Sequence, residues 1–422
     1  NYPDNVVKHF VRQAASGGID LFRVFDCLNW VPNMRVAMDA VIATGKICEG
    51  TVCYTGDMLN PDRAKYDLRY YVGMAKELEA SGAHVLGFKD MAGLLKVPAA
   101  RVLFKALKEE VGLPIHFHTH DTSGAGAATL LAAAEAGVDA VDAAMDSFAG
   151  GTSQPALGSI VEALRFTERD TELDMATIRS LSTYWEQVRQ QYAAFESGNQ
   201  APASEVYLHE MPGGQFTNLK AQARSLGLED RWHQVAETYA EVNRMFGDIV
   251  KVTPSSKVVG DMALMMVSQG LSRAQVEDPG VDVAFPDSVV DMMKGNLGQP
   301  PGGWPQGIQA KVLKGEPALT ERPGKGLAPV DIEAVRATAR EATGDYLGAT
   351  RVAIGTDPGS AAVAYRSLDG HLTAAIDRAR TLYRDNVNTA RFAIAFSGPG
   401  AFILCVLAAA GVAAGFYPRV RE

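Results

Sequence analysis

Cysteine is scarce in this sequence: there are four among 422 residues, and none of them is spaced as Cys-x-x-Cys. This spacing argues against a zinc site built from thiolates. The low number fits a reducing compartment, so we expect a cytoplasmic location. Cys27 and Cys53 lie in apolar stretches that resemble strands, and we predict that both are core residues.

The sequence also has no excess of basic over acidic residues. The 40 Lys and Arg residues are outnumbered by 49 Asp and Glu residues, which gives a net charge of -9. An acidic chain with scattered Lys and Arg argues against nucleic acid as the main partner, and solubility is the simplest consequence of the charge. The chain starts at Asn1 without Met or a signal peptide, and we expect a fragment of a longer protein.

Long hydrophobic runs are absent apart from one near the end, AFILCVLAAAGVAAGF at 401–416. Extended to 392–418, this hydrophobic segment reaches about the length of a transmembrane helix, although Ser, Gly, Pro and Gly interrupt it at 397–400. Two interpretations stay open: a membrane helix, and a buried or unpacked tail. The whole of 346–422 differs in pattern from the rest, and we treat it as a separate tail.

Up to about residue 160, short apolar runs alternate with helical periods. The apolar runs are IDLFRVFD, KICEGTVCYTG, AHVLGFKDMAG, LPIHFHTHDTSG and VDAVDAAMDSF. This alternation predicts a parallel sheet of the α/β class, and the polar ends of the runs are typical of the active edge of a β/α barrel. Five strands fall short of the roughly eight that close such a barrel. Either the sheet is open or three β/α units precede the chain; the abrupt start favours the second, so we predict an N-terminally truncated TIM-type barrel over 1–160.

Beyond this region the pattern becomes mainly helical, which predicts a helical extension over 161–325. Its clearest helical periods are LSTYWEQVRQQYAAF and RWHQVAETYAEVNRMFG, in which apolar residues recur at helical spacing. The Pro- and Gly-rich stretch ERPGKGLAP marks a linker, which we place at 326–345.

His118 and His120 form the sharpest local feature. Residues two apart on a strand face the same side, so the pair can present two imidazoles to one metal ion; neutral imidazole suits Zn, Mn, Fe or Co. His116 is in phase with them but one step deeper. The alternative is two histidines packed in a core, but a position at the carboxyl end of a strand, directly before Asp121, favours a metal site.

Lys89 ends the preceding apolar run. A lysine at the mouth of a barrel is costly to bury as a cation, so it needs an anionic partner, a catalytic task or a chemical conversion. Carbamylation by CO2 is one such conversion, and it would create an anionic oxygen ligand for the metal. An ion pair with an Asp stays open as the alternative. Two histidines and one such ligand still leave the metal short of a further carboxylate.

The turn KVTPSSK at 251–257 is rich in hydroxyl groups and precedes the helical run VVGDMALMMVSQG. Its default interpretation is a helix N-cap made by Ser255 or Ser256. The spare hydroxyl of Thr253 would suit a proton shuttle if the turn reaches the barrel mouth.

Eight segments resemble, in order, the carboxyltransferase domain of pyruvate carboxylase. They are NYPDNVV, LFRVFDCLNWVPNMR, VCYTGD, GFKDMAGLL, HTHDTSGAG, TSQPALG, MPGGQFTNL and KVTPSSKVVGD. The resemblance runs from Asn1 to about Ala342. Oxaloacetate decarboxylase α subunits and transcarboxylase subunits share the fold and the His-x-His, but FRVFDCLNW, TSQP and KVTPSSK are more similar to pyruvate carboxylase.

The resemblance implies a barrel with a helical extension over its active site, and a Zn or Mn ion held by two His, a carbamylated Lys and an Asp. His118, His120 and Lys89 match the first three ligands. The Asp, and the Arg and Gln that bind pyruvate, belong to a part of the family's barrel that precedes this chain. Thr253 matches the catalytic Thr, and Ser256 matches a residue of the pocket that receives the head group of biotin.

The implied reaction moves CO2 from carboxybiotin, delivered by a biotin carboxyl carrier domain, to pyruvate and gives oxaloacetate. Thr253 relays the proton from the methyl group of pyruvate to biotin. The family also implies a homo-oligomer and ATP binding in the full-length enzyme. The sequence contains no ATP-binding domain and no biotin-accepting segment, so we expect this chain alone to be inactive. The alternative functions are an oxaloacetate decarboxylase α or transcarboxylase subunit, and an inactive fragment.

Overall fold

The computed structural model describes residues 2–196, 201–332 and 335. Contacts between residues divide the chain into two units, Asn1–Val330 and Asp331–Glu422. The fold described below is that of the first unit.

Several predictions fall on the second unit. The tail at 346–422 and its hydrophobic segment 392–418 lie outside the described residues, as does most of the linker placed at 326–345. Within the described ranges, no helix is long and apolar enough to cross a membrane.

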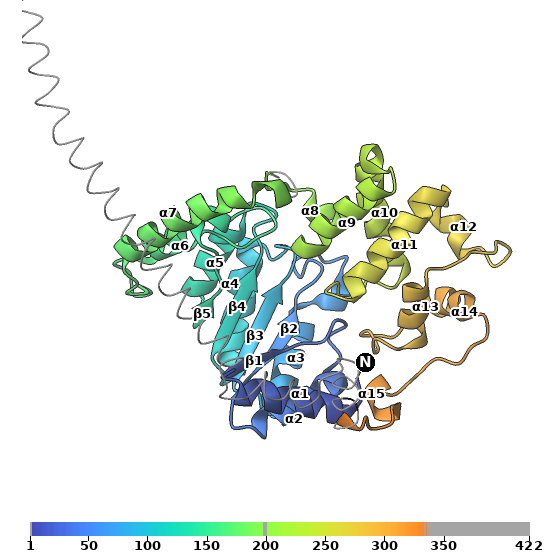
Figure 1. The fold of residues 1–422 in the computed structure, drawn as a ribbon, viewed down its shortest axis with the longest axis horizontal. Coiled ribbons are helices and arrows are strands. Elements are labelled where there is room, and N and C mark those ends of the chain that lie inside the picture. Colours follow the sequence, from blue (N-terminus) through green and yellow to red (C-terminus); the bar gives the residue numbers. More distant parts are fainter. Residues whose placement is uncertain (1, 197–200, 333–334, 336–422) are drawn as a thin grey trace, which may run out of the picture. The chain divides into compact units, whose positions relative to one another are not determined.

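A parallel sheet of five strands lies at the centre of the first unit, in the order β1-β2-β3-β4-β5 (Figure 1). The strands are β1 (Leu21–Val24), β2 (Ile47–Cys53), β3 (Val85–Asp90), β4 (Ile115–Thr119) and β5 (Ala140–Val141). Each strand falls within one of the five apolar runs, and every neighbouring pair is parallel. The prediction of a partial β/α barrel is confirmed.

One helix precedes β1, four more connect the strands, and these helices cover one face of the sheet. They are α1 (Asp4–Ser16), α2 (Val31–Ile42), α3 (Leu68–Ala80), α4 (Val97–Glu110) and α5 (Gly126–Glu135). Phe88 of β3 and Phe117 of β4 are register partners, and both are buried against Phe104 of α4, whose ring centroid lies 5.6 Å and 4.8 Å from theirs. Since side chains alternate along a strand, the residues next to them point to the opposite face. Cys27 and Cys53 are buried, as predicted.

The chain beyond β5 is helical. The helices are α6 (Leu157–Leu164), α7 (Met175–Gln191), α8 (Val206–His209), α9 (Gly213–Ser225), α10 (Trp232–Met245), α11 (Ser255–Gln269), α12 (Arg273–Glu277), α13 (Asp287–Lys294), α14 (Gln306–Leu313) and α15 (Pro323–Gly326). The helical extension is therefore confirmed, and the two clearest helical periods form α7 and α10. Figure 1 shows α7 to α11 on the side of the sheet remote from α1 and α2.

The predicted N-cap of α11 by Ser255 or Ser256 is wrong. Pro254 occupies the N-cap position, and no side chain caps the helix. The Ser255 hydroxyl lies instead 2.9 Å from the carbonyl oxygen of Val250 and 3.0 Å from that of Cys27, which follows β1. Ser255 is already inside the first turn, and its hydroxyl is engaged by these buried carbonyl groups.

Candidate functional site

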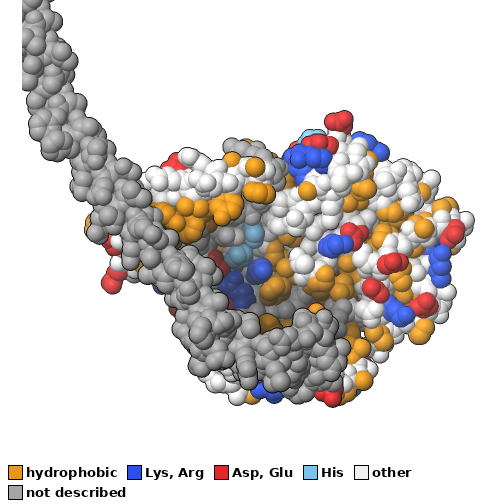
Figure 2. Space-filling view, viewed as in Figure 1, with side chains coloured by type: hydrophobic (Ala, Val, Ile, Leu, Met, Phe, Trp, Pro, Cys, Tyr) orange, Lys and Arg blue, Asp and Glu red, His pale blue; other side chains and the backbone are white. Residues whose placement is uncertain are grey.

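Adjacent strands bring the predicted metal ligands together. Lys89 of β3 and His118 of β4 are register partners, and both point to the face opposite the buried Phe88 and Phe117 because side chains alternate along a strand. His120 directly follows β4. On this side of the molecule, Figure 2 shows a hollow in which His and Lys or Arg side chains gather.

The two histidines are held in a defined orientation. The Nδ1 of His118 lies 2.8 Å from Oδ2 of Asp142, and the Nδ1 of His120 lies 2.6 Å from the carbonyl oxygen of Thr152. A carboxylate and a carbonyl can only accept, so each Nδ1 carries the proton and donates it. In the neutral rings, each Nε2 is then left with a free lone pair.

The Nε2 atoms of His118 and His120 lie 3.3 Å apart. Two imidazoles bound to one tetrahedral ion at about 2.0–2.1 Å would stand at roughly this separation. Burial lowers the pKa of His120 to about 4, so its ring is neutral near pH 7, as a ligand must be. In the part of the chain that the structure describes, no group of three His, Cys, Asp or Glu side chains could hold a metal. A metal ion held by His118 and His120 would therefore need its remaining ligands from other groups.

Lys89 is half-buried beside this pair. Its Nζ lies 4.3 Å from the centroid of the Phe25 ring, and burial lowers its pKa. Asp90 is no partner for it, because that carboxylate accepts from the backbone N–H groups of Leu94 and Leu95 at 2.9 Å. Among the described residues, no carboxylate pairs with Lys89, which leaves its amine available for another role.

A group of four charged and imidazole side chains, hereafter the strand-face cluster, lies next to His118. It consists of Arg23 of β1, Glu49 of β2, His116 of β4 and Asp142, which follows β5. Arg23 Nε lies 2.5 Å from Glu49 Oε1, and its Nη1 lies 3.1 Å from Asp142 Oδ2. The two ring nitrogens of His116 lie 2.9 Å from Glu49 Oε2 and 2.7 Å from Asp142 Oδ1.

The carboxylates of the cluster control its charge. Hydrogen bonds to Asp142 and Glu49 raise the pKa of His116 to about 9. Burial alone would raise the pKa of Asp142, but hydrogen bonds from His116 and His118 outweigh it and hold that pKa well below its usual range. The cationic Arg23 and His116 thus face the anionic Glu49 and Asp142. The sequence pattern places His116 in phase with His118 and His120 but gives no sign of Arg23, Glu49 and Asp142, which come from separate strands.

The turn at 251–257 lies at the carboxyl edge of the sheet. Ser255 holds it to Cys27 after β1, and the buried Lys251 donates to Thr55 after β2 at 3.1 Å. Thr253 is exposed on this turn. Ser256 is fully buried, and within the described residues its hydroxyl has no hydrogen-bond partner. The structure thus brings Thr253 to the edge at which the metal pair lies.

A buried ion cluster supports this turn from the helical extension. Lys251 Nζ lies 3.0 Å from Glu210 Oε2, and Arg63 pairs with both Glu210 and Asp248. Burial would raise the pKa of Glu210, but the charge of Lys251 and the hydrogen bond from Arg63 lower it to about 2. The carboxylate is therefore ionised near neutral pH.

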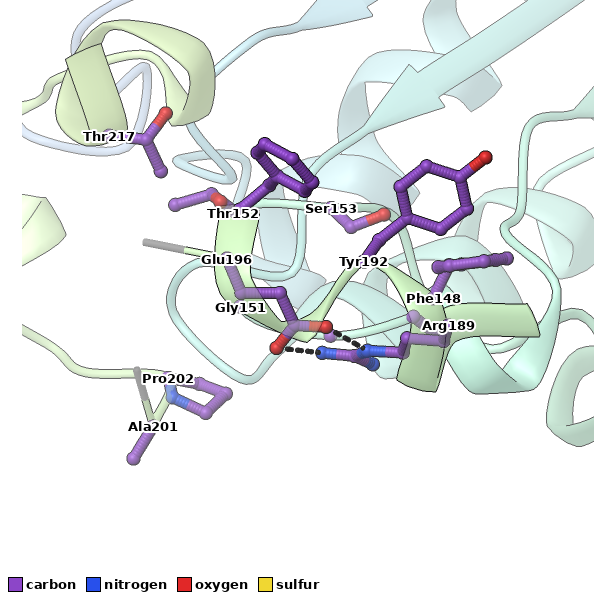
Figure 3. A pocket seen from close by; sticks show the side chains of 13 residues that line it. Phe148, Gly151, Thr152, Ser153, Arg189, Tyr192, Glu196, Ala201, Pro202 and Thr217 are labelled. Atoms are coloured by element: carbon purple, nitrogen blue, oxygen red, sulfur yellow. Dashed lines mark hydrogen bonds and ion pairs between the residues drawn. The ribbon is translucent and has the colours of Figure 1, made fainter. Parts of the chain in front are cut away.

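The loop that carries Thr152 also lines a cavity of about 720 Å3. In Figure 3, Arg189 of α7 and Glu196 point toward each other across one wall of this cavity, with Nε and Oε1 2.6 Å apart. The described lining contains no histidine and no cysteine. The cavity thus shares a loop with the metal pair but lacks metal-binding groups.

Comparison with known proteins identifies the region. A family described as a conserved carboxylase domain matches residues 206–354, and an HMGL-like family matches 52–184. The first match extends past Ala342, where we expected the resemblance to end. Pyruvate carboxylase of Bacillus subtilis is 55% identical over 341 residues, which cover 81% of this chain and 30% of that protein. The mitochondrial pyruvate carboxylase of Homo sapiens is 49% identical over 342 residues, 79% of this chain and 29% of that protein.

Solved structures of pyruvate carboxylase also match this chain. The carboxyl transferase domain of Rhizobium etli pyruvate carboxylase, solved with pyruvate and biocytin, is 68% identical, with a TM-score of 0.81; the match covers 82% of this chain and 58% of that one. The complete multifunctional enzyme from the same organism matches equally well over 34% of its length. The chain spans about 30% of the length of the curated relatives that it matches. It belongs to the pyruvate carboxylase family and corresponds to part of the carboxyltransferase region.

Proposed function

We propose that this chain supplies part of the carboxyltransferase site of a biotin-dependent pyruvate carboxylase, at which a carboxyl group passes from carboxybiotin to pyruvate and gives oxaloacetate. The observation that carries the proposal is the convergence of the His118 and His120 Nε2 atoms, 3.3 Å apart. These atoms lie at the carboxyl edge of a parallel sheet, where β/α barrels hold their active sites. The relative solved with pyruvate and biocytin supports the two substrates.

In this proposal His118, His120 and Lys89 hold a divalent ion, Zn or Mn, whose charge stabilises the enolate of pyruvate. Lys89 becomes a ligand by carbamylation: its neutral amine adds to CO2, a C–N bond forms and one proton leaves. Burial favours this step because it lowers the pKa of Lys89 and so increases the neutral fraction. A carbamate signal in 13C NMR after addition of labelled bicarbonate, absent in Lys89→Arg, would test it.

Thr253 carries the proton in the proposed reaction. Its hydroxyl accepts the proton lost by the methyl group of pyruvate and passes its own proton to biotin, so the side chain ends unchanged. The Thr253 hydroxyl suits this role because it is exposed, while Lys251 and Ser255 of the same turn are buried and hydrogen-bonded and hold the turn in place. Ser256, with a buried and unpartnered hydroxyl among the described residues, is proposed to face the biotin pocket.

A pair of variants tests the assignment of Thr253 in the full-length enzyme, so that the biotin carrier domain and the site residues that precede this chain are present. Thr253→Ala should lower kcat for oxaloacetate formation by about 10²–10⁴-fold. Thr253→Ser keeps the hydroxyl and should retain most of the activity. Equal activity of the alanine and serine variants would contradict the proton-relay role. Sodium-linked decarboxylation of oxaloacetate in place of carboxylation of pyruvate would instead indicate a decarboxylase subunit.

The remaining parts of the proposal concern partners and location. We propose a biotin carboxyl carrier domain and a second copy of the full-length enzyme as partners, and a cytoplasmic location. The human, mouse and rat relatives are named as mitochondrial, so fractionation of the source cells is the direct test of location. Sedimentation of the full-length protein tests the oligomer.

A further inference from the structure

We propose that Asp142 is a positioning residue for the metal site: it sets the tautomer and the ring orientation of His118, and the other members of the strand-face cluster hold its carboxylate in place. The proposal deepens the metal site described above and rests on it. The residues of the cluster come from β1, β2 and β4 and from the position directly after β5. The proposed metal ligands do not by themselves explain why this charged cluster is present, and the proposal gives it a role.

Asp142 makes three contacts with the two oxygens of one carboxylate. Oδ2 accepts from His118 Nδ1 at 2.8 Å and from Arg23 Nη1 at 3.1 Å. Oδ1 lies 2.7 Å from His116 Nε2. Because both oxygens are engaged from different directions, the carboxylate cannot turn without losing a hydrogen bond. Its direction toward His118 is therefore fixed.

Glu49 closes the cluster on the side away from the metal pair. Its carboxylate is fully buried and lies 2.5 Å from Arg23 Nε and 2.9 Å from His116 Nδ1. The two donors that hold Asp142 are thus themselves held. Gly87 lies on β3, between the strands that carry Glu49 and His116, and has no side chain. A Cβ at this position would lie 2.6 Å from Glu49 Oε1. The sheet leaves room for the cluster at this position.

The two histidines are positioned by different means, which gives the proposal an internal comparison. His118 depends on a side chain, the carboxylate of Asp142, whereas His120 donates to the backbone carbonyl of Thr152. Replacement of Asp142 should therefore release the ring of His118 and leave His120 unchanged. A hydrogen bond from a ligating histidine to a carboxylate fixes the ring and increases its basicity, and its loss typically weakens metal binding about 10–100-fold.

The experiment uses this chain with labelled histidine, and it has two readouts. The first is the tautomer of His118 in the metal-free protein, from long-range 1H–15N NMR. We expect the Nδ1–H form in wild type and a mixture with the Nε2–H form in Asp142→Ala, while His120 stays in the Nδ1–H form. The second is the affinity for Co2+ or Zn2+, which should fall about 10–100-fold in the variant.

Asp139→Ala is the matched control. Asp139 precedes β5, and its carboxylate pairs with Lys108 at 2.9 Å and accepts from the backbone N–H of Ile115 at 2.8 Å. Its removal costs stability without contact to the histidines, so neither readout should change. If Asp142→Ala does not fold, Asp142→Asn keeps the size but offers only one acceptor oxygen to three donors, and it should shift both readouts in the same direction.

The outcomes separate this proposal from the metal site on which it rests. An unchanged His118 tautomer in a folded Asp142 variant overturns the positioning role, whatever the metal affinity. If wild type binds no metal, the ion needs the carboxylate that the resemblance places before this chain, and the NMR readout still decides whether Asp142 orients His118. A loss of thermal stability with both readouts unchanged would assign Asp142 a purely structural role and also refute the proposal.

Discussion

Gly213→Ala is the sharpest single test of the histidine geometry, because it alters neither a ligand nor a charge. Gly213 begins α9, and its N–H donates to the carbonyl of Met91 at 2.9 Å. A Cβ at this position would lie 2.6 Å from His120 Nδ1 and 2.6 Å from the carbonyl oxygen of Thr152. These are the donor and the acceptor of the hydrogen bond that orients His120.

The size of the effect follows from these distances. Heavy atoms pack at about 3.5–4.0 Å, so a methyl group at Gly213 must push His120 and Thr152 apart by several tenths of an ångström or more. The hydrogen bond between them, 2.6 Å long, cannot survive this separation unchanged. Loss of the partner that orients a ligating histidine typically weakens metal binding by about 10–100-fold. We therefore expect about 1.4–2.8 kcal/mol less binding free energy for Co2+ or Zn2+.

Gly214→Ala is the control for this variant. It adds the same methyl group one residue later in α9, where no heavy atom lies within 4 Å of the new Cβ. We expect unchanged metal affinity and a stability equal to wild type or higher by about 0.5–1 kcal/mol, because alanine is the better helix former. Metal affinity is measured by isothermal titration calorimetry, and circular dichroism checks that each variant folds. Equal metal affinity of a folded Gly213→Ala and wild type would refute the geometry described for His120.

Two further predictions concern the sheet face and the buried ion cluster. Gly87→Ala places a methyl group against Thr51 Oγ1 and Glu49 Oε1, and we expect a loss of about 1–3 kcal/mol in urea unfolding; unchanged stability would contradict the packing. Glu210→Gln leaves the buried Lys251 without its anion, and we expect a loss of about 3–5 kcal/mol. Since the pKa of Glu210 is lowered from 4.5 to about 2, its stabilisation is complete above pH 5 and is lost as the pH falls toward 2, so Glu210→Gln should flatten the pH dependence of wild-type stability in that window.

The sheet and the proximity of His118 and His120 could be predicted because their signals are local. An apolar run that ends in polar residues marks a strand and its carboxyl end, and the alternation of side chains places His118 and His120 on one side. The pairing of Lys89 with His118 then follows from two neighbouring parallel strands that end at the same edge. These inferences need only the order of residues within each run.

Asp142 could not be predicted in the same way. The run VDAVDAAMDSF contains Asp139, Asp142 and Asp146, and its pattern does not show which of them lies at the end of the strand. The strand β5 is only Ala140–Val141, so Asp142 is the residue at its end, and Asp146 accepts instead from the backbone N–H of Gly158 at 2.7 Å. The choice among the three is made by the register of β5 on β4, which no local pattern encodes.

The helical extension contributes more to the surroundings of His120 than the sequence indicated, because it packs against residues of the barrel part. Gly213 of α9 packs against His120 and hydrogen-bonds to Met91 after β3. The turn that carries Thr253 reaches the same edge through Lys251, which is separated from its partner Thr55 by 196 residues. Each of these contacts joins residues too far apart in sequence for periodicity to reveal, and each fails if the extension is displaced. The positions of His120 and of the Thr253 turn therefore depend on the same docking of the extension onto the sheet, and a variant that loosens this docking should displace both together.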